Sequence, residues 1–282
     1  MSASKPVLVT GSSGFVGRHF VQFLREKQVP VEEFDLAHGD ISEHVFSFPE
    51  LGHVFHLASQ TYVPFSWDRP LDYYRTNVLG TANVLELCRK HSCSLTYVSS
   101  NVYGTPQYLP VDEEHPVRPS SPYSHSKLLA EEMCRYYAET FHIPVAVLRP
   151  VNIYGIGQRD DFLIPTIIRQ VLDPETDCIR VRDIRPKCDY LYVDDFLRAL
   201  YCTTSINGFE IYNIGSGSSI SVEDIILTAL SCAHVSKPYS SEDSERKNEI
   251  WDVYVDVSKF REQFAWNPEI PFGDGLSRCV RA

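Results

Sequence analysis

The chain of 282 residues carries 26 lysines and arginines against 37 aspartates and glutamates, which gives a formal net charge of −11. With 43% apolar, 22% charged and 12% aromatic residues, the composition excludes a disordered chain, a collagen-like repeat and a disulfide-scaffold fold. The acidic balance also argues against a nucleic-acid partner, which would require a basic stripe to offset phosphates.

The length suits one large globular unit or two joined lobes, because domains typically run to about 100–200 residues. No stretch approaches the roughly 20 apolar residues that a membrane-spanning helix needs, and the first residues lack the apolar segment of a signal peptide. The eight cysteines show neither C-x-x-C spacing nor a Cys/His pattern suited to zinc. We therefore expect a cytoplasmic protein with no metal site and no membrane partner.

Short β-rich runs alternate with amphipathic helical stretches along the first half of the chain. The expected strands cover Val7–Thr10 and residues 31–36, 54–58, 95–99 and 145–149, and the expected helices cover residues 17–27, 76–91 and 124–141. Apolar strands that alternate with helices predict parallel βαβ units. The predicted fold class is therefore α/β, with a Rossmann-type doubly wound parallel sheet that binds ligands at the carboxyl ends of its strands.

After residue 150 the pattern becomes less regular and richer in proline and glycine. Helices are expected at Leu163–Leu172 and residues 222–231, a strand at residues 190–193, and an exposed polar loop at residues 236–248. We expect a nucleotide-binding lobe made of residues 1–150 with a returning segment near residues 189–207. A smaller C-terminal α/β lobe for a second ligand would take residues 151–188 and 208–282.

A glycine-rich turn, TGSSGFVG, follows the first strand directly. Its G-x-x-G-x-x-G spacing is one residue longer than the usual dinucleotide fingerprint. Glycine permits the unusual φ values and the close backbone approach of such a turn, and the N–H groups that open the next helix attract a pyrophosphate. The predicted dinucleotide-binding residues of the turn are Gly11, Ser13, Gly14, Phe15, Val16 and Gly17.

Asp35 lies at the end region of the second expected strand, roughly 20 residues after the turn, where dinucleotide-binding folds place an acidic residue. A carboxylate there accepts hydrogen bonds from the adenosine ribose and would repel a 2′-phosphate. The sequence therefore favours NAD as the cofactor, with NADP as the alternative. A solvated loop acid is the other interpretation of Asp35, since Glu32 and Glu33 lie beside it.

Tyr123 and Lys127 stand at positions i and i+4 near the start of a predicted helix. That spacing places both side chains on one helix face, and a nearby ammonium group lowers the pKa of a phenol because it favours the phenolate. Tyr123 is thus a candidate proton donor or acceptor, although the spacing alone also fits an ordinary surface pair. Ser99 and Ser100 end a predicted strand at the edge where the sheet should place its site, so a serine hydroxyl can hold the reacting oxygen there.

At this point the sequence resembles the extended short-chain dehydrogenase/reductases, in particular the NAD-dependent nucleotide-sugar epimerase/dehydratase group. The matching motifs, in chain order, are TGSSGFVG, HLAS, TNVLGT, SSNVYG, YSHSK, LRPVNIYG, DYLYVDD and YNIGSG. The resemblance implies an enzyme that holds NAD(P) in a Rossmann-type lobe and a nucleoside-diphosphate sugar in a C-terminal lobe. It also implies a homodimer packed through helices at residues 82–91 and 124–141.

The resemblance makes Ser99, Tyr123 and Lys127 the catalytic set, with Ser99 aligned by its distance before the Val-Tyr-Gly of SSNVYG. Tyr123 would exchange a proton with the sugar hydroxyl while Lys127 holds the nicotinamide ribose. Further cofactor contacts implied are Asp40, Ile41, Leu57, Ala58, Ser59, Asn77 and Pro150. Implied sugar-nucleotide contacts are Tyr62, Ser99, Ser100, Asn101, Asn152, Arg185 and Arg246.

Some of these residues have alternative interpretations. Asn77 also suits a helix-start cap, Asn152 suits a turn, and Arg185 and Arg246 suit ordinary surface charges. Cys188 stands where the family usually has an arginine, and only residues 36–39 separate Asp35 from Asp40, where the family normally fits a longer connection and another strand.

Ser100 and Asn101 occupy the positions at which sugar dehydratases of the family carry an Asp-Glu pair. Elimination needs a general acid and a base, so dehydration by that route is disfavoured. A 4-epimerase needs only reversible oxidation at C4 with the hydride held on the nicotinamide, and this is the expected reaction. The alternatives are a 4-ketoreductase of a 4-keto-6-deoxy nucleotide sugar and a non-catalytic dinucleotide-binding protein, which the intact Tyr123 and Lys127 oppose.

Overall fold

A computed structural model describes residues 5–244 and 250–282 of the chain. Two compact units make up the chain. Unit 1 comprises Met1–Gly104, Pro116–Pro150 and Leu197–Tyr212, and unit 2 comprises Thr105–His115, Val151–Phe196 and Asn213–Ala282. Arg246, one of the implied sugar-nucleotide contacts, lies outside the described residues, as do residues 245–248 of the expected polar loop.

A six-stranded sheet forms the centre of unit 1, in the order β2-β1-β3-β4-β5-β9. Its strands are β1 (Val7–Thr10), β2 (Val31–Phe34), β3 (His53–His56), β4 (Ser94–Val98), β5 (Val145–Pro150) and β9 (Phe209–Ile214). The pairs from β2 to β5 are parallel, which confirms the predicted Rossmann-type doubly wound sheet. The strand order reverses between β1 and β3, and ligands of such sheets bind at this reversal, beyond the carboxyl ends of the strands.

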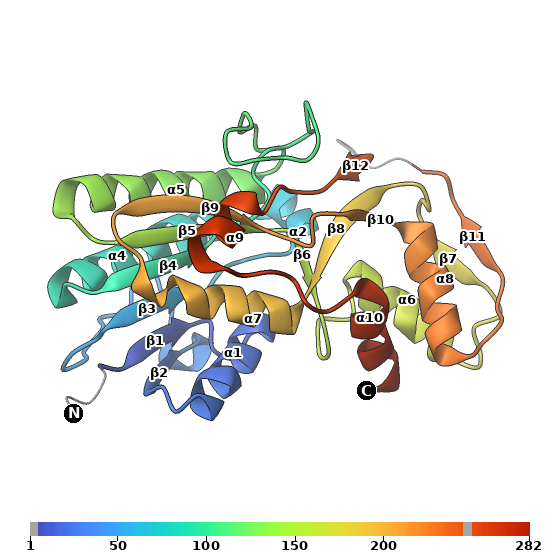
Figure 1. Ribbon diagram of the computed structural model, residues 1–282, viewed down its shortest axis with the longest axis horizontal. Coiled ribbons are helices and arrows are strands. Elements are labelled where there is room, and N and C mark those ends of the chain that lie inside the picture. The colour runs from blue at the N-terminus through green and yellow to red at the C-terminus, as the bar shows by residue number, and fades with distance from the viewer. Residues whose placement is uncertain (1–4, 245–249) are drawn as a thin grey trace. The chain divides into compact units, whose positions relative to one another are not determined.

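Helices cover both faces of this sheet (Figure 1). The helical elements between β1 and β5 include α1 (Phe15–Glu26), α2 (Val63–Asp68), α3 (Pro70–Tyr73), the π-helical segment η2 (Tyr74–Leu79), α4 (Gly80–His91) and α5 (Pro122–Phe141), of which α1, α4 and α5 pack on the sheet. On one face, Leu85 and Cys88 of α4 and Cys134 of α5 join the buried core. On the other face, Phe20 of α1 meets Phe55 of β3 edge to face, with ring centroids 4.6 Å apart. The site is therefore built on a rigid sheet that is buried on both sides.

Several element ends differ from the expected ones for local reasons. Helix α5 begins at Pro122 because the Ser121 hydroxyl caps the Ser124 N–H, and proline suits the first helical turn. Strand β2 ends at Phe34 because Asp35 instead caps the short helix η1 (Leu36–His38). This short helix occupies the connection between residues 35 and 40, where relatives would place another strand. In the described part of the chain, β2 is therefore the edge strand of the sheet. The helix expected over residues 76–91 begins as the π-helical η2.

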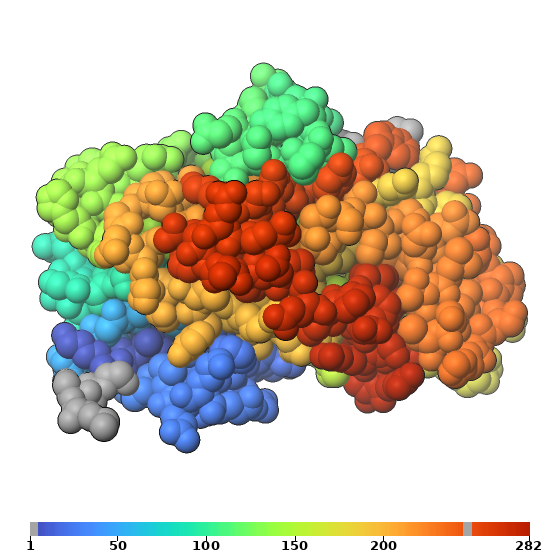
Figure 2. Space-filling view, viewed as in Figure 1, coloured from blue at the N-terminus to red at the C-terminus, as the bar shows by residue number. Residues whose placement is uncertain are grey.

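Unit 2 combines small sheets with helices. Its strands are β6 (Asn152–Tyr154), β7 (Ile179–Val181), β8 (Lys187–Tyr192), β10 (Ser219–Ser221), β11 (Tyr239–Ser241) and β12 (Asp252–Val253), and its helices are α6 (Leu163–Leu172), α8 (Val222–Ala233), α9 (Ser258–Phe264) and α10 (Phe272–Arg281). Helix α10 packs against α8, and the two lie side by side on the face shown in Figure 2. Strand β11 pairs with β7, so the prediction of a continuous loop from residue 236 was wrong at these residues.

Helix α7 (Val193–Cys202) and the short η3 (Thr203–Ser205) complete the elements. Within residues 5–244 and 250–282, no helix has the length and apolar character that crossing a membrane requires. The same residues contain no group of three or more His, Cys, Asp or Glu side chains arranged to hold a metal ion.

Candidate functional site

The glycine-rich turn lies at the carboxyl end of β1 and leads into α1. Gly11 has a φ of +71°, and a Cβ added there would lie 2.7 Å from the Ala58 backbone nitrogen. A Cβ on Gly17 would lie 2.0 Å from the Gly11 carbonyl oxygen. No side chain caps the start of α1 at Gly14, which leaves the positive end of that helix to an anionic group. The predicted pyrophosphate cradle thus has the backbone geometry that the glycines were expected to provide.

The loop that follows β3 is tied to the end of β1. The Leu57 N–H donates to the Thr10 carbonyl at 3.2 Å, and the Ala58 N–H donates to the Thr10 hydroxyl at 3.3 Å. His56 links this hydroxyl, at 2.7 Å, to Thr81 of α4, at 3.0 Å. Burial lowers the pKa of His56 to about 3, so its ring is neutral and acts as a hydrogen-bonding bridge. These contacts fix the turn and the loop in one position at the strand-order reversal.

Asp35 lies just beyond β2, and its carboxylate is already engaged. It accepts a hydrogen bond from the Ala37 N–H at 3.0 Å and lies 2.8 Å from His38 Nδ1. The contacts with His38, and then with the Ser13 hydroxyl and Ala37, hold the pKa of Asp35 below its ordinary value. A carboxylate has about four acceptor sites, so Asp35 keeps capacity for ribose hydroxyls. The sequence predicted Ser13 and Asp35 as cofactor contacts. It did not predict that His38 contacts the Asp35 carboxylate.

Asp40 and Ile41 follow the short η1 connection. The Asp40 carboxylate accepts from the Ser42 N–H and hydroxyl at 2.9 and 2.8 Å, and these bonds lower its pKa. Ile41 is 4% exposed and packs against Gly80, where a Cβ would lie 2.7 Å from Ile41 Cγ2. The Ile41 side chain is therefore a core residue. Asp40 instead borders a pocket of about 260 Å³ that is also lined by Gln60, Phe65, Arg69, Asp72, Tyr73, Arg75 and Thr76.

Asn77 lies within η2, so the helix-start cap proposed for it from the sequence is wrong. Its side chain is 1% exposed and accepts from the Gln60 N–H at 2.8 Å and the Ser59 hydroxyl at 3.0 Å. It also donates to the Ser126 hydroxyl of α5 at 2.9 Å. Asn77 thereby joins the loop after β3 to the helix that carries Tyr123.

Tyr123 and Lys127 lie in the first turns of α5, as predicted. Lys127 is 2% exposed, and its Nζ lies 3.3 Å from the Ser59 hydroxyl and 4.6 Å from the centre of the Tyr97 ring. Burial lowers the pKa of Lys127 to about 7 and raises the pKa of Tyr123 to about 12. The expected lowering of the Tyr123 pKa was wrong for this state of the protein, because burial of the phenol is the largest influence on it and the Ser100 hydroxyl opposes that rise only in part.

The two serines after β4 have different surroundings. Ser99 is 3% exposed and donates to Glu131 Oε1 at 2.5 Å. Ser100 is 9% exposed, and its hydroxyl makes no hydrogen bond of ordinary geometry with the described residues. It nevertheless lies close enough to Tyr123 to stabilise the phenolate and oppose the rise in the pKa of Tyr123. Ser100 therefore has a hydroxyl available beside Tyr123, whereas Ser99 is committed to Glu131.

Three other predicted residues of unit 1 lie in ordinary local contacts. The Asn101 side chain accepts from the Tyr103 N–H at 3.3 Å. The Tyr62 carbonyl accepts from the Tyr73 hydroxyl, and the Tyr62 ring meets Phe65 at 4.8 Å. Pro150 ends β5 at the carboxyl edge of the sheet. Glu131 and Arg149, which form a buried ion pair, were missed by sequence reasoning, because nothing in their spacing marks them as partners.

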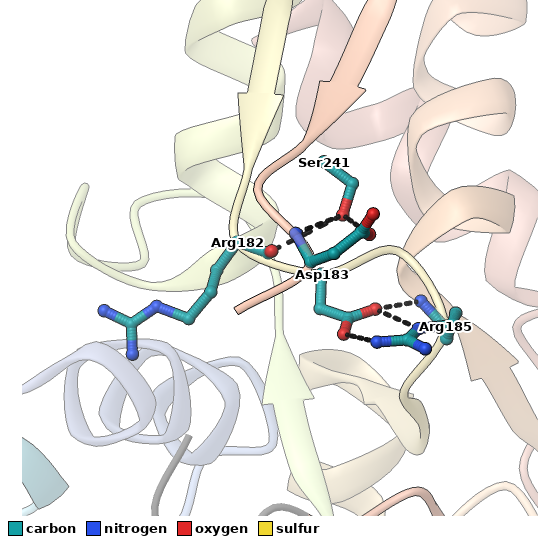
Figure 3. Close-up of polar contacts among 5 residues, drawn as sticks. Arg182, Asp183, Arg185 and Ser241 are labelled. Carbon is teal, nitrogen blue, oxygen red and sulfur yellow. Dashed lines mark hydrogen bonds and ion pairs between the residues drawn. The ribbon is translucent and has the colours of Figure 1, made fainter. Parts of the chain in front are cut away.

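In unit 2, Arg185 is held by its neighbours. Its Nη2 lies 2.6 Å from Asp183 Oδ2 and its Nε 3.0 Å from Asp183 Oδ1, and its guanidinium stands 4.9 Å from the Trp251 ring centre. Figure 3 shows these two hydrogen bonds between the Arg185 guanidinium and the Asp183 carboxylate, with the Arg182 side chain pointing the other way. Asn152 is exposed and donates to the Asp189 carbonyl at 3.3 Å. Both side chains therefore have polar partners within unit 2.

A doubly wound sheet, a glycine turn at its strand-order reversal and a Tyr/Lys pair beside it define an NAD(P)-dependent enzyme of the extended short-chain dehydrogenase/reductase type. The model of the NAD dependent epimerase/dehydratase family matches residues 7–215, and the chain belongs to this family. Its members modify nucleotide sugars as epimerases, reductases and dehydratases.

Individual relatives match the chain along nearly its whole length. A proposed UDP-glucose 4-epimerase of Methanocaldococcus jannaschii is 33% identical over 303 residues, which cover 97% of each chain. The GDP-6-deoxy-D-mannose reductase of Pseudomonas aeruginosa is 32% identical, with 96% of this chain and 94% of that one covered. The structure of RMD from Pseudomonas aeruginosa, complexed with NADPH, has a TM-score of 0.89 at 32% identity and covers 98% and 97% of the two chains.

Proposed function

We propose that the chain is an NAD-dependent nucleotide-sugar 4-epimerase. The observation that carries the proposal is the make-up of the site beside Tyr123, where Ser100 and Asn101 follow β4. The Tyr123 phenol can transfer a proton there. Elimination would also require an acid and a base at residues 100 and 101, and neither Ser100 nor Asn101 can take those roles. Asp35 supports NAD over NADP, since its carboxylate would repel a 2′-phosphate. A tightly held NAD that is reduced and reoxidised within each turnover suits epimerisation.

The proposed roles follow from the environment of each side chain. NAD, when bound, would accept the hydride from C4 of the sugar and return it. With a pKa near 12, Tyr123 holds its proton at neutral pH and can give it to a C4 oxygen. To take a proton, Tyr123 needs stabilisation of its phenolate, which the Ser100 hydroxyl and a protonated Lys127 would supply. The glycine turn, Asp35, the loop after β3 and Pro150 would hold the cofactor.

A 4-ketoreductase is the second candidate. The similarity to the GDP-6-deoxy-D-mannose reductase of Pseudomonas aeruginosa favours it, as does a Tyr123 that holds its proton, because reduction of a ketone needs a proton donor. The proposed contact of Asp35 with the adenosine ribose opposes it, since the related RMD structure contains NADPH and the carboxylate would repel the 2′-phosphate.

A panel of UDP-, GDP-, dTDP- and CDP-sugars tests the proposal. The purified protein is incubated with each sugar, and NMR identifies the configuration at C4 while the absorbance of reduced nicotinamide is followed. The proposal expects an epimer of one sugar nucleotide with no net change in that absorbance. Sustained consumption of a reduced cofactor with a 4-keto sugar would instead establish the reductase.

The two serines should respond differently to loss of the hydroxyl. Ser100→Ala should lower kcat by about 10- to 100-fold, because the substrate oxygen and the Tyr123 phenolate both lose a donor, and removal of one such donor costs at most about 10²–10³. Steady-state kinetics provide the measurement. Ser99→Ala is the matched comparison and should retain more activity, since its hydroxyl faces Glu131. An unchanged kcat in Ser100→Ala, with a loss in Ser99→Ala, would return the substrate-binding role to Ser99.

We also propose the remaining roles assigned from the resemblance. Asn152 and Arg185 of unit 2 would contact the sugar nucleotide, with the Arg185 guanidinium directed to phosphate oxygens, which suit its geometry.

Helices α4 and α5 would form a homodimer. Tyr136 and Phe141 support this proposal, because they are aromatic rings of α5 that are 60% and 42% exposed.

A further inference from the structure

A buried ion pair joins α5 and β5 in unit 1. Glu131 of α5 and Arg149 of β5 are 3% and 4% exposed, and Arg149 Nη2 lies 2.6 Å from Glu131 Oε2 while its Nε lies 3.0 Å from Oε1. Burying two charges carries a desolvation cost, and well-packed apolar side chains often replace such a pair without loss of stability. Stability alone therefore does not explain the pair.

The pair lies next to the strand end that precedes Ser100 and next to Lys127 on α5. Glu131 Oε1, besides contacting Arg149, accepts a hydrogen bond from the Ser99 hydroxyl. Glu131 also follows Lys127 by one helical turn, and positions i and i+4 share a helix face. On its other side, the Arg149 guanidinium stands 4.8 Å from the centre of the Tyr103 ring. One carboxylate thus contacts the end of β4 and faces Lys127.

We propose that Glu131, held by Arg149, is the positioning residue of this centre: it fixes the backbone segment that presents Ser100, and it supplies the negative charge that keeps Lys127 an ammonium group. The inference rests on the proposed function, because it gives Lys127 and Ser100 their roles in proton transfer. Glu131 itself touches neither substrate nor cofactor in this scheme and acts through its two neighbours.

The charges around Lys127 support this role. Burial lowers the pKa of Lys127 to about 7, and the Glu131 carboxylate opposes that shift. The other titratable groups described around Lys127 are neutral: burial raises the pKa of the Tyr123 and Tyr97 phenols and of the Cys134 thiol, and it lowers that of His56. Glu131 is accordingly the carboxylate in the described surroundings of Lys127 that favours its protonated form. Without it, the pKa of Lys127 should fall further.

Glu131→Gln keeps the shape of the side chain and removes its charge, and Glu132→Gln, the same change at the next, exposed position of α5, is the control. The titration of Lys127 is measured without substrate by competitive acetylation over a pH series, with mass spectrometry of the labelled peptide. In Glu131→Gln we expect a lower titration midpoint, a basic limb of the kcat profile at lower pH, and a kcat reduced by about 10- to 100-fold with little change in KM. Glu132→Gln should match the wild type.

Glu131→Met/Arg149→Met removes both charges, so it leaves no unpaired charge to unfold the protein and allows the test if Glu131→Gln fails to fold. A folded double variant with lowered kcat and a lowered Lys127 midpoint would support the inference. Wild-type values for both would show that the pair is only structural and would overturn it. A wild-type protein that turns over no nucleotide sugar would overturn the proposed function, while the acetylation midpoint would still decide the charge coupling.

Discussion

Tyr123→Phe should lower kcat by about 10²–10⁴-fold, because the variant keeps the ring and loses the phenol that exchanges a proton with the sugar oxygen. Tyr123 lies one helical turn from Lys127 and beside the Ser100 hydroxyl, and neither of these side chains holds a proton at the position of the Tyr123 oxygen. Steady-state kinetics with the sugar nucleotide found in the panel measure the loss. Affinity for NAD, measured by calorimetry, should change little.

Tyr136→Phe provides the matched control. Tyr136 lies on the same helix and is 60% exposed. The variant loses the same hydroxyl and keeps the ring that the proposed dimer contact uses, so it should keep wild-type kinetics. A Tyr123→Phe variant with full activity would show that another group transfers the proton and would remove the central role assigned to Tyr123.

Gly17→Ala should weaken NAD binding at least about 10-fold, which corresponds to a loss of about 1.4 kcal/mol. A Cβ at this position would lie 2.0 Å from the Gly11 carbonyl oxygen and 2.9 Å from Ser12 Cα. Both contacts are with backbone, so the glycine turn itself must shift to admit a methyl group. Overpacking of this kind also costs about 1–3 kcal/mol of folding stability. Calorimetric titration with NAD and thermal unfolding provide the two measurements.

Gly273→Ala is the control for this substitution. Gly273 lies in α10, and a Cβ there would have only an ordinary contact, 4.0 Å from Thr228 Cγ2. The variant should bind NAD as the wild type does, and its stability should rise slightly because alanine is preferred over glycine in a helix. Equal NAD affinity in Gly17→Ala and wild type would contradict the placement of the pyrophosphate at this turn.

The periodic elements of the fold could be predicted from the sequence because their signals are local. The β-rich run Val7–Thr10 followed by glycines and an amphipathic helix predicts a βαβ unit, and the structure confirms the parallel sheet. The element ends were less accurate where a side chain changes the local backbone. Asp35 caps η1 and so ends β2 early, while Ser121 starts α5 before the expected residue.

The candidate site shows the same division between local and distant interactions. Tyr123 and Lys127 are four residues apart, and their helical spacing makes them detectable as a pair. Glu131 and Arg149 meet only because α5 packs on β5, and no sequence periodicity connects a helix position to a strand position. The pKa of Tyr123 was predicted with the wrong sign because the sequence shows the neighbouring lysine and does not show the burial of both groups.

The central claim is that hydride leaves C4 of a nucleotide sugar and returns to the same carbon while Tyr123 moves the proton. The most direct measurement uses the sugar nucleotide turned over in the panel, labelled with deuterium at C4, and follows the C4 label by NMR and mass spectrometry. The account predicts a C4 epimer that retains the deuterium, with no reduced cofactor consumed. A product that gains unlabelled hydrogen from an added reduced nicotinamide cofactor, or no C4 inversion with any sugar nucleotide, would contradict it.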